Sequence, residues 1–325
     1  MTTARALRVP TTGGPSVLRV DTVEVPDPGE GQARVRVAAC GVNFIDVYQR
    51  EGLYPVPTPF TTGNEGAGVV EAVGPGVGVA PGDRVAWAMQ PGSAAESALV
   101  AGRLLVPVPE GVELDVAAAA MLQGMTAHYL VTSTYAVQPG DAVLVHAAAG
   151  GVGQWLVQWC AAKGATVIAT AGSADKLATA QSLGARHVID YTQVPDLAAA
   201  VREATAGAGV HVAYDGVGRS TFEASLAALR PRGVLALFGA ASGPVPPFDL
   251  QRLNAAGSLF VTRPSLAHYI LDREELLWRS GEVFAALAAG TVRLQVAGRY
   301  PLEEAQAAYR ALEGRASTGK LLLLP

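Results

Sequence analysis

Apolar and polar residues alternate over short stretches in the first third of the chain, and glycine and proline separate these stretches. Alternation with a period of two residues is typical of strands that bury one face. Turns such as 80–83, with the sequence APGD, favour antiparallel connections. We expect extended segments at residues 18–25, 32–39, 66–73, 84–88 and 97–108. Helical spacing interrupts them at 43–51, so the region is predicted to be rich in β structure.

From about residue 116 the pattern changes to alanine-rich helical stretches that alternate with β-branched runs. Segments of about 12 to 18 residues with helical spacing separate the first five of these runs. This alternation is typical of βαβ units and predicts a doubly wound parallel sheet. The predicted strands lie at residues 142–147, 166–171, 187–191, 210–217, 233–239 and 258–262.

The last part of the chain is predicted to complete the first domain. Two further helices are expected at 272–289 and 303–312, and the chain ends with the apolar run 321–324. That run is too short to anchor in a membrane, so we expect it to pair as a final strand with the first region. The predicted fold class is therefore α/β with two domains. A β-rich domain comprises 1–124 and 266–325, and the doubly wound domain comprises 125–265.

Composition and charge narrow the function classes. Half of the residues are apolar and only 16% are charged, which suits a large core and disfavours long disordered segments. The net charge of -4 comes without a block of like charge, so we expect no nucleic-acid partner. The start MTTARALRVP has no apolar signal region. Two cysteines, Cys40 and Cys160, are too few for a disulfide framework, so we expect a reducing, cytoplasmic compartment. No apolar run is long enough to span a membrane, so we expect no membrane contact.

A glycine-rich turn follows the strand predicted at 142–147. Set against the pattern G-x-G-x-x-G, the first position is Ala148, and Gly150 and Gly153 occupy the other two. Such glycines let the backbone approach a pyrophosphate closely, and the start of the next helix offers unpaired N–H groups. A tight turn without a ligand is the alternative. The order of strand, turn, helix and strand favours a dinucleotide site.

The end of the second predicted strand distinguishes the two nicotinamide cofactors. An NAD site usually has Asp or Glu there to accept a hydrogen bond from the ribose 2′-OH. This chain has Gly172 and Ser173 instead, followed by Lys176, which is one of only three lysines. A hydroxyl and an ammonium suit a 2′-phosphate, and Tyr191 can close the same pocket. The residues therefore favour NADPH, with a solvated helix start at 175–176 as the alternative.

Several further motifs occur in a fixed order along the chain: Gly13-Gly14-Pro15 with Val17-Leu18, Gly41 to Tyr48, Gly63 to Gly68, Ala147 to Gly153, Tyr214 to Gly218 and Val261 to Pro264. With these motifs the chain resembles, over essentially its full length, the zinc-free medium-chain dehydrogenases/reductases of the quinone oxidoreductase (zeta-crystallin) family. The resemblance implies a GroES-like catalytic domain and a Rossmann cofactor domain. It also implies NADPH as the hydride donor, a quinone as the small-molecule substrate and a homodimer. Ala148 departs from the general Rossmann pattern but is usual in this family.

The resemblance also implies roles for individual residues. Catalytic residues beside the nicotinamide are expected at Asn43, Asp46 and Tyr48. Cofactor contacts are expected at Phe44, Tyr48, Thr126, Gly151, Val152, Gly172, Ser173, Lys176, Tyr191, Phe238, Gly239, Ala240, Ala241, Arg263 and Ser265. Among these, Gly151 and Val152 resemble the pyrophosphate loop, and the set from Gly172 to Tyr191 resembles the 2′-phosphate pocket.

Metal-dependent relatives hold a catalytic zinc with a cysteine where this chain has Asn43 and a histidine where it has Asn64. Neither amide is a competent zinc ligand, and Glu65 alone cannot hold the ion, so we expect no metal. Without a Lewis acid the substrate has to be electrophilic already, as a quinone is. Tyr48 is the residue that could stack on such an acceptor and donate a hydrogen bond to its oxygen. Half-buried packing is the alternative for Tyr48.

Two other functions stay open at this point. An NADPH-dependent reductase of α,β-unsaturated carbonyls would use the same residues with a different acceptor pocket. A non-catalytic nucleotide-binding or RNA-associated protein is the third hypothesis, and the absence of a basic stripe weighs against RNA. None of the five histidines has metal spacing, and His146 is interpreted as a satisfied core residue. No serine lies in a G-x-S-x-G elbow, so a hydrolase is not indicated.

The assignment of Lys176 to the 2′-phosphate generates a direct prediction. Replacing Lys176 by alanine should raise the KM for NADPH about tenfold, because one charge-assisted contact is lost. The KM for NADH should barely change, since NADH has no 2′-phosphate. Steady-state kinetics with both cofactors measure this, and an equal effect on the two would contradict the assignment.

Overall fold

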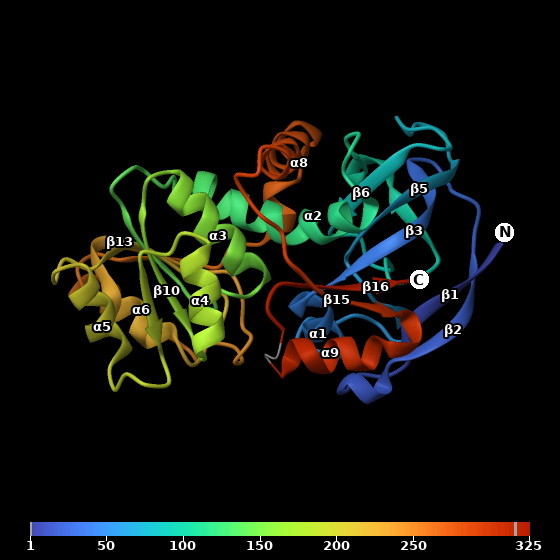
Figure 1. The fold of residues 1–325 in the computed structure, drawn as a ribbon. Coiled ribbons are helices and arrows are strands. Elements are labelled where there is room, and N and C mark those ends of the chain that lie inside the picture. The colour runs from blue at the N-terminus through green and yellow to red at the C-terminus, as the bar shows by residue number, and fades with distance from the viewer. Residues whose placement is uncertain (1, 315–316) are drawn as a thin grey trace. The chain divides into compact units, whose positions relative to one another are not determined.

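The computed structural model describes residues 2–314 and 317–325, which form two compact units (Figure 1). The first unit comprises residues 1–125, 269–288 and 294–325. The second comprises residues 126–268 and 289–293. In the described part of the chain, none of the helices combines the length and the apolarity that crossing a bilayer demands.

The first unit is built on two sheets. A seven-stranded sheet has the order β15-β16-β3-β5-β6-β8, with β7 paired to β3, and a three-stranded sheet has the order β2-β1-β4. The strands of this unit are β1 (Thr2–Val9), β2 (Arg19–Val25), β3 (Gln32–Val42), β4 (Phe60–Thr61), β5 (Glu65–Val73), β6 (Arg84–Ala88), β7 (Ser97–Ala101), β8 (Val106–Pro107), β15 (Val296–Pro301) and β16 (Lys320–Leu324). Its helices are α1 (Phe44–Arg50), α8 (Arg273–Ala288) and α9 (Ala305–Glu313), and α2 (Leu114–Tyr129) begins here.

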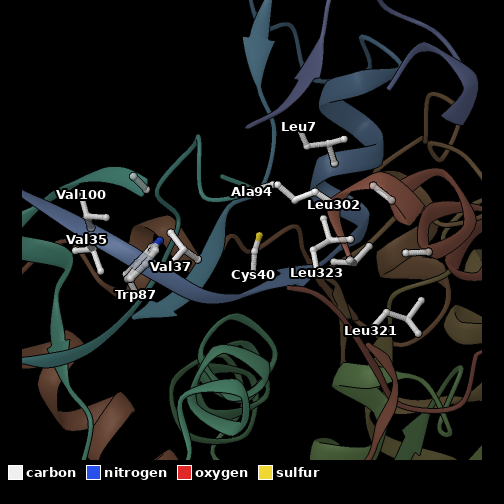
Figure 2. Packing of buried hydrophobic residues seen from close by; sticks show 14 of the residues in the cluster. Leu7, Val35, Val37, Cys40, Trp87, Ala94, Val100, Leu302, Leu321 and Leu323 are labelled. Atoms are coloured by element: carbon white, nitrogen blue, oxygen red, sulfur yellow. The ribbon is translucent and has the colours of Figure 1, made fainter. Parts of the chain in front are cut away.

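Alternating side chains of these strands make the core of the first unit. Trp87 of β6 lies with Val35 and Val37 of β3 in one apolar cluster, which continues to Leu323 of β16 (Figure 2). The indole N–H of Trp87 donates to the Ser93 hydroxyl at 2.8 Å. A buried ring with a satisfied donor contributes its full apolar area to stability, because no polar atom is left without a partner.

The chain end completes the first unit, as predicted. Strand β16 pairs antiparallel with β3, and Leu323 lies opposite Cys40. One extended segment, expected over 97–108, is instead two strands separated by the 3-10 turn η2 (Gly102–Leu104). Gly102 donates its N–H to the Gly31 carbonyl at 2.8 Å, which turns the chain there. Strands β1 and β15 were not predicted.

The second unit is the predicted parallel sheet. Its six strands have the order β11-β10-β9-β12-β13-β14, and each neighbouring pair is parallel. The strands are β9 (Ala142–Val145), β10 (Thr166–Ala171), β11 (His187–Asp190), β12 (Val210–Asp215), β13 (Leu229–Leu237) and β14 (Phe260–Thr262). The helices are α3 (Gly151–Ala162), α4 (Ala174–Ser182), α5 (Leu197–Ala204), α6 (Phe222–Ala228) and α7 (Gln251–Ala255). This is the Rossmann order, which reverses between β9 and β12.

A short late segment also belongs to the second unit. Arg293 donates its backbone N–H to Gln158 Oε1 at 2.7 Å, and Gln158 Nε2 donates back to the Arg293 carbonyl at 3.2 Å. Gln158 is buried on α3. Residues 289–293 therefore pack with α3, whereas the sequence pattern places them with the first domain.

Candidate active site and cofactor-binding loops

The turn between β9 and α3 has the geometry of a pyrophosphate loop. Ala147 has a φ of 48°, in the left-handed region, and its carbonyl accepts the N–H of Gly150 at 2.8 Å. A Cβ on Gly153 would lie 2.3 Å from that same carbonyl oxygen, so only glycine lets α3 approach the turn this closely. The N-cap of α3 is Gly150, which has no side chain to cap the helix. Gly151 and Val152 therefore open the helix in the way an anion site requires.

The predicted 2′-phosphate residues come together at the end of β10. Tyr191 follows β11 and donates its N–H to the Ala171 carbonyl at 3.2 Å. A Cβ on Gly172 would lie 2.5 Å from the Tyr191 hydroxyl, so the ring packs directly over this glycine. Ser173 is the N-cap of α4 and makes no capping hydrogen bond with its side chain. Lys176 lies in the first turn of the same helix. The nearby Asp190 directs its Oδ1 to Thr192.

The later stretches that are predicted to border the cofactor lie at the same edge of the sheet. The N–H groups of Phe238 and Gly239 donate to the Asp215 carbonyl at 2.9 and 3.4 Å, which holds the loop after β13 against the end of β12. Ala241 donates to the Gly216 carbonyl at 3.3 Å, and Ala240 lies between these contacts. Arg263 Nη1 donates to the Leu237 carbonyl at 3.1 Å. The remaining predicted contacts lie on α2 and after β14, at Thr126 and Ser265.

In the first unit, a buried carboxyl group fixes the start of α1. Asp46 Oδ2 accepts the backbone N–H of Asn43 at 2.9 Å and the hydroxyl of Tyr309 at 3.2 Å. Its Oδ1 accepts from Asn64 Nδ2 at 2.7 Å. Burial raises the pKa of Asp46 to about 6, and the hydrogen bond from Asn64 opposes that rise. Three donors on one carboxyl hold the first turn of α1 against α9 and the residue before β5.

An ion pair lies beside this helix start and is completely buried. Lys320 Nζ is 2.5 Å from Glu65 Oε2 and 2.8 Å from Asn43 Oδ1, and neither charged side chain is exposed. The other oxygen of Glu65 accepts the Leu122 N–H at 2.6 Å. A Cβ on Gly41 would lie 2.0 Å from Glu65 Oε2. Glycine is therefore required where β3 passes the carboxylate.

The ion pair and the backbone of β3 together engage the hydrogen-bonding groups of the Asn43 side chain. Its Nδ2 donates to Glu65 Oε2 at 2.8 Å and to the Gly41 carbonyl at 3.2 Å, while its Oδ1 accepts from Lys320. Sequence reasoning missed Lys320 as a site residue and considered Glu65 only as a metal ligand. One signal was present: Lys320 is a rare lysine at the start of an otherwise apolar strand.

Tyr48 lies on α1 among other aromatic rings. Its ring centroid is 6.0 Å from that of Phe44 and 5.2 Å from that of Tyr54. Tyr48 is 8% exposed, whereas Tyr54 is 39% exposed. The capping carboxyl of Asp46 and the aromatic residues Phe44 and Tyr48 thus lie on one short helix.

The comparisons with known proteins agree with this arrangement. Residues 29–138 match the family model of the alcohol dehydrogenase GroES-like domain, and residues 151–273 match that of the zinc-binding dehydrogenases. Quinone oxidoreductase 1 of Escherichia coli strain K12 is 44% identical over 319 residues, which cover 96% of this chain and 97% of the relative. The chain belongs to the quinone oxidoreductase family. Its fold is therefore GroES-like in the first unit and Rossmann in the second, as expected.

Two other proteins have a comparable similarity to this member of the quinone oxidoreductase family. The 2-haloacrylate reductase of a Burkholderia species is 44% identical over 322 residues and covers 96% of both chains. A mycobacterial protein whose structure contains NADPH is 50% identical, with a TM-score of 0.96 over 99% of this chain and all of that one. The chain is an oxidoreductase of a family with NADPH-bound members.

The zinc implied by one family description does not fit the residues present. In the described ranges 2–314 and 317–325, no group of three or more histidine, cysteine, aspartate or glutamate side chains is placed to hold a metal ion. Asn43 and Asn64 use their side-chain N–H groups as donors, and Glu65 is already paired with the ammonium of Lys320. Amide groups are poor zinc ligands.

The buried ion pair predicts a non-additive pattern of stability. Glu65→Gln and Lys320→Met should each lower the free energy of unfolding by about 3 to 5 kcal/mol, because the remaining charge stays buried without its partner. The double variant should recover most of that loss. Urea denaturation at pH 7 measures all three. Arg19→Met, which breaks an exposed pair with Asp21 at 2.8 Å, is the matched control and should cost less than about 1 kcal/mol. Additive losses in the double variant would contradict this account.

Proposed function

We propose that this family member is an NADPH-dependent quinone oxidoreductase that works without a metal. The observation that carries the choice of NADPH is the end of β10, where Gly172, Ser173 and Lys176 stand in place of the acidic residue of an NAD site. The likeness to a named quinone oxidoreductase supports the choice of acceptor. The NADPH in the mycobacterial relative supports the same cofactor here.

Each proposed cofactor contact follows from the position of a residue. The N–H groups at Gly151 and Val152 bind the pyrophosphate, and Ser173 with Lys176 binds the 2′-phosphate under the ring of Tyr191. The loop 238–241 and the residues Thr126, Arg263 and Ser265 border the remainder of the cofactor. Bound NADPH supplies a hydride from its nicotinamide ring.

The proposed role of the first unit is to position an acceptor that needs no Lewis acid. Reduction restores the aromaticity of a quinone, so its oxygens require only a hydrogen-bond donor as charge accumulates. We assign this donor role to Tyr48, with Phe44 beside it on the same helix. Asn43 and Asp46 act through α1, because their polar atoms are already engaged with Lys320, Glu65, Asn64 and Tyr309.

A second candidate function is the reduction of activated alkenes. The 2-haloacrylate reductase is as similar to this chain as the quinone oxidoreductase is, at 44% identity each. A carbon–carbon double bond conjugated to a carbonyl or carboxylate also accepts a hydride at carbon. The same cofactor residues would serve this reaction, so the acceptor alone separates the two functions.

An acceptor panel separates the two functions, and a Tyr48 variant tests the donor role. NADPH absorbance should fall with a naphthoquinone or an ortho-quinone, and turnover with an enone or 2-chloroacrylate should be slower. Turnover confined to the alkenes would establish the second function, and no oxidation with any acceptor would refute both.

Tyr48→Phe should lower kcat/KM for quinone about tenfold or more, because one hydrogen bond to developing charge is lost. NADPH binding, measured by fluorescence titration, should not change, and unaltered turnover would remove the donor role.

We also propose that the protein acts as a cytoplasmic homodimer. Strand β14 is the last strand of the sheet described for the second unit, and it exposes 61% of Phe260 and 37% of Val261. An exposed edge strand with apolar side chains favours pairing with another strand, and a second copy of β14 offers a self-complementary one. The buried free thiols of Cys40 and Cys160 suit a reducing compartment.

The dimer proposal predicts the effect of a charge on β14. Phe260→Lys should convert the wild-type dimer into a monomer near the chain mass of 33.3 kDa, because the lysine would be buried in the paired edge. Leu271→Lys is the matched control, since Leu271 is 70% exposed but lies in the first unit. Sedimentation equilibrium at micromolar concentration measures the mass. A dimeric Phe260→Lys variant, or a monomeric wild type, would overturn the proposal.

A further inference from the structure

A row of buried hydrogen bonds crosses the second unit next to the pyrophosphate loop. His146 Nδ1 is 2.9 Å from Thr170 Oγ1, and its Nε2 is 3.0 Å from Ser225 Oγ. Ser225 Oγ donates to Asp215 Oδ2 at 2.8 Å. None of these four residues is more than 2% exposed. We name Thr170, His146, Ser225 and Asp215 the strand-end relay.

The direction of each hydrogen bond in the strand-end relay is determined at its acidic end. Asp215 accepts from the N–H groups of Val217 and Gly218 and from the Thr221 hydroxyl, as well as from Ser225. The Ser225 hydrogen is thus committed to Asp215, and its oxygen accepts from His146 Nε2–H. The Nδ1 atom of His146 then accepts from the Thr170 hydroxyl.

The histidine of the relay is therefore neutral and has one tautomer. Burial lowers the pKa of His146, and the charge of Asp215 opposes that change. A protonated ring would carry a hydrogen on both nitrogens, so Thr170 would have to reverse its hydroxyl. The neutral Nε2–H form satisfies every member of the row.

The relay lies where the backbone ladders of the sheet stop. The pairing of β9 with β10 ends at Val145 and Ala169, and its pairing with β12 ends at Val145 and Tyr214. His146 is the next residue after β9. Its side chain is hydrogen-bonded to Thr170 of β10 and to Ser225 of α6. Beyond this point the loops have few ladder bonds, although Ala148 N–H still reaches the Thr170 carbonyl at 3.1 Å.

Three of the four relay residues lie at or next to the end of a strand that leads to a proposed cofactor loop. His146 precedes the pyrophosphate turn, Thr170 lies two positions before Gly172, and Asp215 precedes the turn 216–218. The carbonyl of Asp215 also holds Phe238 and Gly239, as described above. One side-chain row thus sets the spacing of three cofactor loops.

The composition of the relay invites a different interpretation, as a serine, histidine and aspartate catalytic triad. In a triad the carboxylate orients the histidine and the histidine activates the serine. Here Asp215 contacts the serine instead, and Ser225 donates its only hydrogen to that carboxylate. Ser225 is fully buried, so no substrate reaches it. The row has no nucleophile.

We propose that His146 is a positioning residue for the cofactor: its neutral ring holds the pyrophosphate loop at a fixed distance from the strand end that leads to the 2′-phosphate pocket. The inference rests on the use of a nicotinamide dinucleotide by this protein. The relay touches no group that distinguishes NADPH from NADH, so it serves both cofactors equally. This property separates His146 from Lys176, which serves only the 2′-phosphate.

The test compares variants of the relay by their dissociation constants for both cofactors. His146→Leu should weaken NADPH and NADH by about the same factor, on the order of tenfold, because two hydrogen bonds that fix the loop are lost. In steady-state kinetics the loss should fall on the KM for the cofactor rather than on kcat. His146→Asn, which retains an acceptor near the Nδ1 position, should recover part of the affinity. His187→Leu, at the amino end of β11, is the matched control.

Further measurements keep the outcome decisive if His146→Leu folds poorly. Thr170→Val preserves side-chain shape and removes only the hydroxyl, so it should weaken both cofactors in parallel by a smaller factor. Nitrogen-15 NMR of the wild type should show the neutral Nε2–H tautomer at pH 7. Unchanged affinities in folded variants, a loss confined to NADPH, or an Nδ1–H tautomer would each overturn the positioning role. Wild-type protein that binds neither cofactor would instead refute the proposed function.

Discussion

The structure of the first unit depends on one buried charge being neutralised. Glu65 is at the start of β5 and has no access to water, so an ionised carboxylate there requires a cation within contact distance. Lys320 supplies that cation from the last strand, and Asn43 joins the pair from the position just before α1. Three elements far apart in the chain are thereby fixed around one carboxylate. The same contact occupies the side chains of Asn43 and Glu65, so neither is free to bind a metal ion at this place.

The second unit is under a different constraint, because its proposed ligand is anionic and its sheet is made of parallel strands. Such a sheet places all carboxyl ends, and hence the loops that follow them, along one edge. Glycines at 150, 153 and 172 let backbone and rings approach each other there. Loops this close need restraints that the backbone ladder no longer provides. Buried polar side chains at the strand ends fill that need, and their complete hydrogen bonding is what makes their burial tolerable.

Local patterns in the sequence predict much of the fold. The βαβ alternation predicted the parallel sheet, and the apolar chain end predicted a final strand that pairs with the first region. Both predictions are confirmed, and the structure identifies β3 as the partner. Strand β1 was not predicted because Arg5 and Arg8 interrupt its apolar pattern. Strand β15 was not predicted because it contains Gly298 and Pro301. The ion pair of Glu65 and Lys320 joins residues 255 positions apart, so no local pattern reveals it. Only the register of three strands brings these two side chains together. The assignments of individual site residues to substrate and cofactor remain predictions.

The placement of β16 has a consequence for biosynthesis. Nearly all of the second unit is one uninterrupted stretch, 126–268, which is synthesised before Lys320 and the rest of β16. The first unit lacks a sheet strand, and Glu65 lacks its counter-ion, until Lys320 emerges. Vectorial synthesis therefore lets the Rossmann unit close first. Until β16 is synthesised, the β-rich half stays open at the edge of β3.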